Sequence, residues 1–179
     1  LIEQILSSHS KVFGADEVLY IPQLIDEYFG KNKLNLSLQG ISNFDSSQLT
    51  KIAKDYIFLM ESISKNSKKT VDKLPANFLN IGLIKLILPK SKIIHCYRNP
   101  KDNIFSIFKN HFSANKIKFA SDLYETVEYY NLYFDLMNYW KKILPNTIID
   151  IDYEKLVADP DKQILNLIKS SGLDWDKKC

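Results

Sequence analysis

The sequence predicts an α/β domain in which a short parallel sheet is covered by helices. Lys92–Tyr97 and Thr147–Asp152 are short apolar runs rich in β-branched residues, a pattern typical of buried strands. A further short strand is predicted over Thr70–Pro75, and a helical pattern over Asn77–Leu88 follows it. Because this order is strand, helix, strand, we expect Thr70–Pro75 and Lys92–Tyr97 to form a parallel βαβ unit.

The composition indicates one folded domain over residues 1–179. Hydrophobic residues make up 45% of the chain and aromatic residues 12%, which is enough to build a sizeable core. The net charge is only +3, and no dense Lys/Arg block stands out, so a nucleic-acid partner is not expected. No apolar run reaches 18 residues, so no membrane span is expected.

Cysteine and histidine are sparse. The two cysteines, Cys96 and Cys179, form no metal-ligand pair, and the three histidines show no ligand spacing, so we expect no metal. The composition favours a bacterial, cytoplasmic protein. Leu1 lies inside an apparent helix without an N-cap, and the chain stops soon after Trp175, so we expect a domain truncated at both ends.

The first half of the chain is predicted to be mainly helical. Leu1–His9 has a helical pattern, and Val12–Ala15 is predicted to be a short connection. Glu17–Phe29 is predicted to be a helix whose true start lies near residue 21, because Pro22 is tolerated only in a first turn. Gly30–Asp45 is polar and is predicted to be a loop, and a helix with a polar N-cap follows, to about Ile63.

The second half alternates strands and helices. After Lys92–Tyr97, apolar residues recur at helical spacing from Asp102 to about Phe112. Ser113–Ala120 is predicted to be a loop, and a long helix capped by Ser121 or Asp122 runs to about residue 144. A last helix is predicted over Asp161–Ser171, with Gly172 ending it.

Arg98 and Ser106 are the first candidate site residues. Ligands bind at the carboxyl ends of strands in open α/β sheets, and Arg98 follows such an end. Ser106 lies eight residues later, about two turns into the next helix. A guanidinium and a hydroxyl at this spacing can converge on one phosphate-sized anion.

Four motifs together resemble the sulfotransferase family. They are Gly14-x-x-Glu17, Asp72-Lys73-x-Pro75, Arg98-x7-Ser106 and Tyr153-Glu154-x-Leu-Val-x-Asp-Pro160. Their order and spacing are most similar to the bacterial branch that carries tetratricopeptide repeats and to the tyrosylprotein sulfotransferases. The resemblance covers nearly the whole chain, but the phosphate-cradling loop that precedes the first helix in this family is not present before Leu1.

The resemblance implies a fold and a chemistry. The fold is a P-loop-NTPase-like three-layer sandwich with a short parallel sheet flanked by helices. The reaction transfers a sulfuryl group, without a metal, from 3′-phosphoadenosine 5′-phosphosulfate to a hydroxyl or amine of a protein, glycan or small molecule. Glu17 matches the general base, and Lys73 matches the lysine that stabilises charge between sulfur and the leaving phosphate.

The resemblance also assigns the donor-binding residues. Arg98 and Ser106 match the pair that holds the 3′-phosphate, and Tyr153 matches a tyrosine near the nucleotide. Glu154 is interpreted as structural. The acceptor and the oligomeric state are left open by the sequence.

Two other classes of function remain. A P-loop nucleotide kinase or NTPase shares the predicted sheet order, although no Gly-Lys-Ser/Thr loop occurs in the chain. A catalytically inactive fragment that acts as an interaction module is the other alternative. Dependence on Mg²⁺ separates the first from a sulfotransferase. A folded chain with no nucleotide affinity, even when the phosphate-cradling loop is restored, indicates the second.

Overall fold

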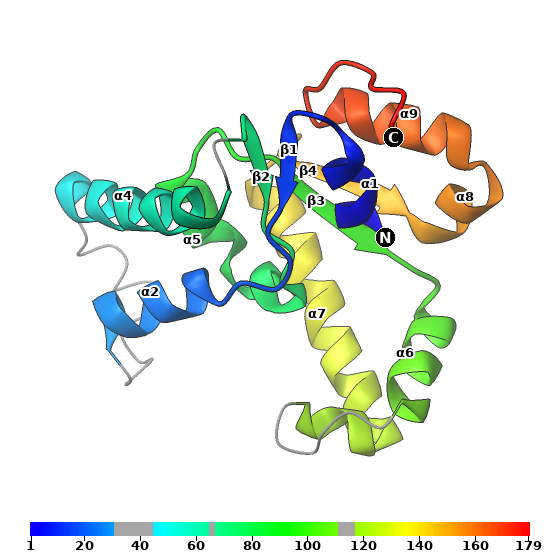
Figure 1. The fold of residues 1–179 in the computed structure, drawn as a ribbon. Helices are drawn as coiled ribbons and strands as arrows, with labels where there is room; N and C mark the ends of the chain where they lie inside the picture. Colours follow the sequence, from blue (N-terminus) through cyan, green and yellow to red (C-terminus); the bar gives the residue numbers. More distant parts are fainter. Residues whose placement is uncertain (31–44, 65–66, 111–116) are drawn as a thin grey trace. The chain divides into compact units, whose positions relative to one another are not determined.

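The structure is a computed structural model that describes residues 1–30, 45–64, 67–110 and 117–179. It is mixed α/β, with short parallel sheets among helices (Figure 1). The contacts divide it into two compact units. The first unit contains Leu1–Ser91 and Asp174–Cys179, and the second contains Lys92–Leu173. In the described residues, each unit holds one pair of parallel strands.

The sheet of the first unit pairs β1 (Val12–Gly14) with β2 (Lys69–Val71). Two hydrogen bonds continue the ladder past the ends of the strands: Ala15 N–H donates to the carbonyl of Val71, and Lys73 N–H donates to that of Asp16. Helix α1 (Ile2–Ser8) packs on both strands. Gly14 permits this approach, because a Cβ atom there would lie 3.0 Å from Ser7 Cβ.

Helices form the rest of the first unit. They are α2 (Tyr20–Phe29), α4 (Ser46–Ile63), the 3₁₀ helix η2 (Pro75–Asn80) and α5 (Ile81–Ile87). Helix α4 begins with a capping box between Asp45 and Gln48, as the polar start of this segment predicts. It packs against α2 and α5 through apolar side chains that are almost fully buried. The main members of this core are Ile21, Leu24, Phe29, Ile52, Met60, Ile81 and Ile87.

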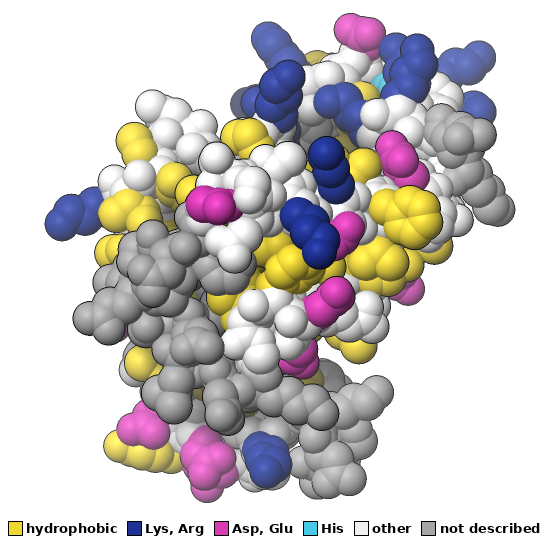
Figure 2. All heavy atoms as spheres, turned by 90° about the vertical axis from the view of Figure 1, so that its left-hand side faces the viewer, with side chains coloured by type: hydrophobic (Ala, Val, Ile, Leu, Met, Phe, Trp, Pro, Cys, Tyr) yellow, Lys and Arg dark blue, Asp and Glu magenta, His cyan; other side chains and the backbone are white. Residues whose placement is uncertain are grey.

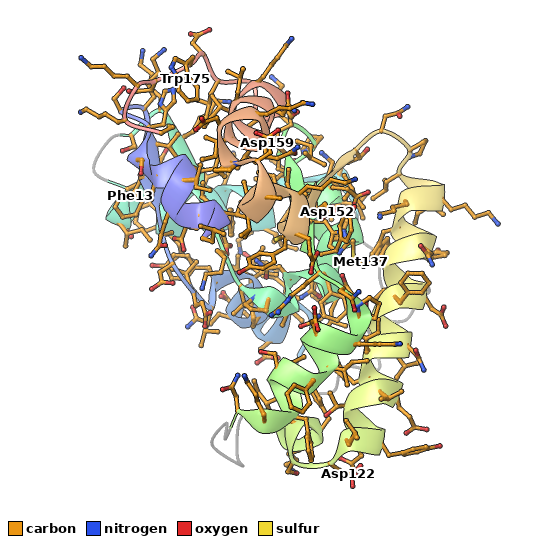
Figure 3. All side chains as sticks on the ribbon, turned by 90° about the vertical axis from the view of Figure 1, so that its right-hand side faces the viewer. Phe13, Asp122, Met137, Asp152, Asp159 and Trp175 are labelled. Carbon is orange, nitrogen blue, oxygen red and sulfur yellow. The ribbon has the colours of Figure 1, made fainter. Side chains whose placement is uncertain are left out.

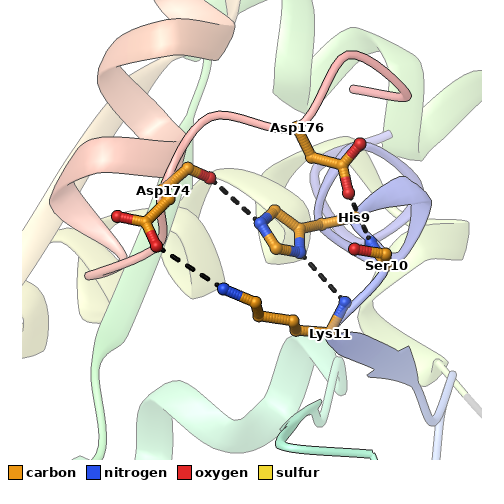
Figure 4. A network of polar contacts seen from close by, with 5 residues as sticks. All are labelled: His9, Ser10, Lys11, Asp174 and Asp176. Atoms are coloured by element: carbon orange, nitrogen blue, oxygen red, sulfur yellow. Dashed lines mark hydrogen bonds and ion pairs between the residues drawn. The ribbon is translucent and has the colours of Figure 1, made fainter.

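The C-terminal segment Asp174–Cys179 belongs to the first unit through contacts with residues 9–11 (Figure 4). The buried His9 ring accepts the Lys11 N–H at Nδ1, so its proton lies on Nε2, which donates to the carbonyl of Asp174 at 3.0 Å. Asp176 Oδ2 accepts the Ser10 N–H at 2.9 Å. Hydrogen bonds from the Ser10 side chain and from the N–H groups of Ser10 and Lys178 hold the pKa of Asp176 well below its ordinary value.

The second unit is built on β3 (Ile93–Tyr97) and β4 (Ile148–Asp152), which pair in parallel from Ile93↔Ile148 to Tyr97↔Asp152. His95 in the middle of β3 hydrogen-bonds through Nδ1 to Asp150 at 2.6 Å and through Nε2 to the Tyr133 hydroxyl. Burial lowers the pKa of His95, although Asp150 acts in the opposite direction. A neutral ring with its proton on Nδ1 therefore satisfies both partners.

Five helical segments complete the second unit. They are α6 (Pro100–Lys109), the 3₁₀ helix η3 (Lys118–Ser121), α7 (Leu123–Ile143), α8 (Tyr153–Ala158) and α9 (Pro160–Ser170). Asp122 caps α7 and Asp152 caps α8, and Figure 3 labels both with Asp159, which lies between α8 and α9. Gly172, at φ 68°, ends α9 in a Schellman motif, with Leu173 N–H donating to the carbonyl of Ile168.

Several local predictions are corrected. Val12–Gly14 is a strand rather than a connection, and the second strand is Lys69–Val71 rather than Thr70–Pro75. The helix predicted over Asn77–Leu88 begins as 3₁₀ turns, and η3 lies inside the loop predicted over Ser113–Ala120. The predicted loop residues 31–44 and the helix end at Phe112 lie outside the described residues.

The predicted parallel βαβ unit of β2 and β3 stays a prediction, because in the described residues the two strands are not paired with each other. Each strand has a different parallel partner: β2 pairs with β1, and β3 pairs with β4. The two strands also belong to different units. Strands that follow each other in a chain are spatial neighbours only in about two-thirds of cases, so the order strand, helix, strand does not fix adjacency.

The surface carries charges of both signs. In the face shown in Figure 2, Lys and Arg side chains gather in the upper part, with acidic groups among them. The helices that the structure describes include none with the length and apolar character needed to cross a membrane. Within the same residues, no group of three or more His, Cys, Asp or Glu side chains is arranged to hold a metal ion.

Candidate active site

Two candidate site residues, Glu17 and Lys73, meet in the first unit. Both follow the carboxyl ends of parallel neighbours, Glu17 after β1 and Lys73 after β2. The carboxyl ends of parallel strands lie at the same sheet edge, which brings together residues 56 positions apart in sequence. Lys73 Nζ donates to Glu17 Oε1 at 2.6 Å. Glu17 lies before α2, not inside it, because the helix begins only at Tyr20.

Asp16 is a second partner of Lys73 that the sequence did not single out. Its Oδ1 lies 3.2 Å from Lys73 Nζ, and its carbonyl accepts the Lys73 N–H. Asp16 has φ 56°, a left-handed conformation that Asp tolerates better than most residues. Its own N–H donates to Glu3 Oε1 on α1. Glu3 therefore fixes the turn that carries both carboxylates to the lysine.

The Lys73 ammonium is strongly paired although its side chain is partly exposed. The exposed fractions are 39% for the Lys73 side chain and 54% for the Glu17 side chain. Desolvation lowers the pKa of Lys73, but the hydrogen bonds and charges of Glu17 and Asp16 outweigh it and raise the pKa above the ordinary value. The lysine is therefore held as a cation at the sheet edge.

Behind Lys73 lies a buried polar network. Both oxygens of Asp72 are hydrogen-bonded: Oδ2 accepts from the Tyr56 hydroxyl at 2.8 Å, and Oδ1 accepts from Asn77 Nδ2 at 3.1 Å. Burial raises the pKa of Asp72, against the effect of these two hydrogen bonds. The network ties α4, the end of β2 and η2 together, so it anchors the backbone from which Lys73 extends.

Arg98 and Tyr153 meet in the second unit, again at the carboxyl ends of two parallel strands. Arg98 follows β3, and Tyr153 follows β4 at the start of α8. The guanidinium carbon of Arg98 lies 5.3 Å from the centre of the Tyr153 ring, a cation–π contact. An open depression of about 490 Å³ lies here, lined by Tyr97, Arg98, Asn99, Pro100, Asp152, Glu154, Lys155 and Ala158.

The Arg98 guanidinium has a hydrogen-bond donor, Nε, that the described residues leave unused. Its Nε atom is buried, and among the described residues no group accepts a hydrogen bond from it. The closest acid is Glu154, whose Oε1 lies 3.8 Å from Nε, a distance that allows an ion pair but is too long for a hydrogen bond. Glu154 Oε1 instead accepts the Asn99 N–H at 3.1 Å. A guanidinium with free donors beside a depression fits an anionic ligand.

Ser106 is not brought into contact with Arg98. It lies within α6, which begins at Pro100 after the Asn99 cap, and it does not line the depression. The Ser106 carbonyl accepts from Asn110 Nδ2. The structure thus joins Glu17 with Lys73 and Arg98 with Tyr153, while the predicted convergence of Ser106 with Arg98 stays a prediction.

The first unit thus places a carboxylate–ammonium pair at its sheet edge, and the second unit places a guanidinium beside a tyrosine ring. Comparison with known proteins shows the family. The model of the sulfotransferase family matches residues 1–177, so the chain belongs to the sulfotransferase family. A relative from Aquifex aeolicus (strain VF5), described as an uncharacterized protein, is 32% identical over 186 residues. The match covers 99% of this chain but only 24% of that relative.

Proposed function

We propose that this domain transfers a sulfuryl group from 3′-phosphoadenosine 5′-phosphosulfate to a hydroxyl or amine of an acceptor. The observation that carries the proposal is the direct contact of Glu17 with Lys73, two residues far apart in sequence that the family resemblance assigns to catalysis. Membership of the family supports transferase chemistry in general. Protein or peptide, glycan and small-molecule acceptors are all compatible with the proposal.

Glu17 and Lys73 are the proposed catalytic residues. Glu17 takes the proton of the acceptor, whose oxygen or nitrogen forms a bond to sulfur as the bond from sulfur to the donor phosphate breaks. Lys73 stabilises the negative charge that develops on the bridging oxygen. In this structure Lys73 is engaged with Glu17 and Asp16, so it exchanges at least one of these partners when it acts on the sulfuryl group.

Arg98, Ser106 and Tyr153 are the proposed donor-binding residues. The free donors of Arg98 fit the 3′-phosphate, and Tyr153 both packs against the guanidinium and offers a ring for the nucleotide. Ser106 supplies a hydroxyl from α6. The donor supplies the activated sulfuryl group, and no metal is needed in the proposal because Lys73 and Arg98 supply the positive charge.

The family also implies features that belong to this proposal. We expect a P-loop-NTPase-like three-layer sandwich with a short parallel sheet flanked by helices, formed by a single domain over residues 1–179. We also expect a bacterial, cytoplasmic enzyme, and similarity to the branch that contains tyrosylprotein sulfotransferases.

The first test measures nucleotide binding by isothermal titration of the natural protein with adenosine 3′,5′-bisphosphate and with ADP, each with and without Mg²⁺. The proposal predicts a preference for the bisphosphate that does not require Mg²⁺. Arg98→Ala should weaken bisphosphate binding about 10- to 100-fold, the effect of losing charge-assisted hydrogen bonds. The control variant is Lys162→Ala, which removes an exposed lysine from α9 and should bind normally.

The same measurement separates the alternatives. Equal, Mg²⁺-dependent binding of ADP that survives Arg98→Ala would favour a nucleotide kinase or NTPase. Binding of neither nucleotide would favour the inactive interaction module. Within the proposal, Glu17→Gln should lower turnover while bisphosphate affinity stays unchanged, because Glu17 acts on the acceptor. Lost affinity with normal turnover at saturating donor would refute this role.

A further inference from the structure

Glu154 is the acid of the second unit that lies closest to the Arg98 guanidinium. Its side chain is 47% exposed, and that of Arg98 is 40% exposed. Glu154 Oε1 accepts the Asn99 N–H at 3.1 Å and lies 3.8 Å from Arg98 Nε. One carboxylate oxygen therefore faces both the backbone and the side chain of the turn that links β3 to α6.

The contact lies just beyond the last pair of the β3–β4 ladder, Tyr97↔Asp152. Asn99 lies two residues after Tyr97, and Glu154 lies two residues after Asp152, in the first turn of α8. The hydrogen bond from the Asn99 N–H to the Glu154 side chain therefore links the two segments that leave this sheet edge. It also fixes the residue that caps α6, because Asn99 accepts the Lys101 N–H through its side chain.

Two neighbouring residues together hold the Arg98 guanidinium. Tyr153 lies against the guanidinium, with its ring centre 5.3 Å from Cζ, and Glu154 lies beside Nε. The ion-pair distance to Glu154 is measured at Nε, so this contact leaves the two terminal nitrogens to other partners. These terminal nitrogens form the planar fork that binds a phosphate in a bidentate way.

We propose that Glu154 is a positioning residue for the Arg98 anion site: it orients the guanidinium through Nε and the Asn99 N–H, so that the terminal nitrogens face the 3′-phosphate of the donor. This inference rests on the proposed function. It replaces the purely structural role that the sequence suggested for Glu154. The carboxylate serves an anion site indirectly, by holding the cation that binds the ligand.

The inference gives a change of affinity with a definite sign. A carboxylate near an anion repels it, so if Glu154 were only a nearby charge, removing it would tighten anion binding. If Glu154 orients Arg98, removing it weakens binding in spite of the lost repulsion. The two roles therefore predict opposite effects of the same substitution.

The experiment measures the dissociation constants of adenosine 3′,5′-bisphosphate and adenosine 5′-monophosphate for the natural protein and for Glu154→Ala. We expect the bisphosphate to bind about tenfold more weakly to the variant, the effect of losing one charge-assisted contact. Binding of the monophosphate, which lacks the 3′-phosphate, should stay unchanged. A residue that merely supported the fold would weaken both ligands alike.

Two further variants complete the test. Glu154→Gln keeps an acceptor oxygen for the Asn99 N–H but loses the charge that faces Nε, so its affinity should lie between those of the natural protein and Glu154→Ala. Glu128→Gln removes an exposed carboxylate from α7 in the same unit and should not alter the ratio of the two affinities. Unfolding without ligand is measured in parallel for every variant, to compare their folded states.

The possible failures are distinguishable. If the natural protein binds the bisphosphate no better than the monophosphate, the proposed 3′-phosphate site is wrong. The positioning role of Glu154 is then wrong as well. If the natural protein prefers the bisphosphate and both Glu154 variants retain that preference, or increase it, only the positioning role is wrong.

Discussion

The Lys73 and Arg98 sites lie at similar positions in their sheets, but the two cations differ in how closely carboxylates pair with them. Each cation follows the carboxyl end of a parallel strand pair. Lys73 Nζ has two carboxylate partners, at 2.6 and 3.2 Å, which hold its pKa above the ordinary value. Among the residues that the structure describes, Arg98 has one carboxylate partner, at 3.8 Å, and its buried Nε atom makes no hydrogen bond.

This difference favours different roles for the two cations, one in ligand binding and one in catalysis. A cation with unused donors is ready to bind a stable anionic ligand, because no existing contact must be broken. A cation paired with a carboxylate gains little from a resting anion and is better suited to charge that appears only during a reaction. The comparison therefore supports a binding role for Arg98 and a transition-state role for Lys73.

The largest expected effect comes from removing the Lys73 ammonium. Lys73→Ala should lower kcat about 10²- to 10³-fold, the range found when one electrostatic donor to a transition state is lost. The dissociation constant of adenosine 3′,5′-bisphosphate should stay within about twofold, because Lys73 acts on the reacting bond and the 3′-phosphate site belongs to Arg98. Sulfuryl-transfer assays and isothermal titration measure the two quantities.

The control for this prediction is Lys54→Ala, which removes an exposed lysine from α4 in the same unit. Its kcat should be normal. A Lys73→Ala enzyme with normal kcat and weakened bisphosphate binding would reverse the roles assigned to Lys73 and Arg98.

A smaller effect is expected from the network behind Lys73. Tyr56→Phe removes the hydroxyl that donates to Asp72 and should reduce the free energy of unfolding by about 1.5–3 kcal/mol, the value of a hydrogen bond to a charged group. Urea unfolding measures the loss. The Arg98 site lies in the other unit, so bisphosphate affinity should stay unchanged in the folded variant.

The pH dependence of this loss has a definite sign. The Tyr56 hydrogen bond acts to lower the pKa of Asp72, against the larger effect of burial, so removing it raises that pKa further in the folded state. The ionised carboxylate is the form that loses stabilisation. The difference between Tyr56→Phe and the natural protein should therefore be full at neutral pH and shrink as the pH falls through the pKa of Asp72. A difference independent of pH would mean that Asp72 is not the acceptor that matters.

Sequence patterns predicted the elements whose causes are local. The β-branched run of β3 and the polar start of α4 lie within a few residues of the structures they specify. Val12–Gly14 is only three residues long, and it becomes a strand because β2 pairs with it and α1 packs on Gly14. Such partners come from distant parts of the chain, so no local sequence pattern predicts them.

The contacts between site residues also could not be predicted from local sequence patterns. The family resemblance assigned Glu17 and Lys73 to catalysis, but their direct contact was not predicted, since nothing near either residue in sequence indicates the other. Asp16 was overlooked as a partner of Lys73, although Asp is one of the few residue types that tolerates the positive φ found there. The position of Glu154 beside Arg98 and Asn99 depends on the β3–β4 register, which the sequence alone does not give.

The smallest and most direct test removes the partners of Lys73 one at a time. Glu17 and Asp16 raise the pKa of Lys73 against desolvation, so Asp16→Asn and Glu17→Gln should each lower it, and the double variant should lower it most. Asn also tolerates the left-handed backbone of residue 16, so the first substitution keeps the turn. The titration of Lys73 is followed by NMR of ¹³Cε-labelled lysine.

The double variant would also give Lys73 the property that marks Arg98, a cation with hydrogen-bond donors that carboxylates do not use. Sulfate should then bind near Lys73 and shift its ¹³Cε resonance, whereas it should leave that resonance unchanged in the natural protein. An unchanged Lys73 pKa in the double variant would show that the two carboxylates do not neutralise the lysine in solution. In that case both cations would be equally open to anions, and their separate roles would have to arise from the ligand rather than from the partners each cation has in the fold.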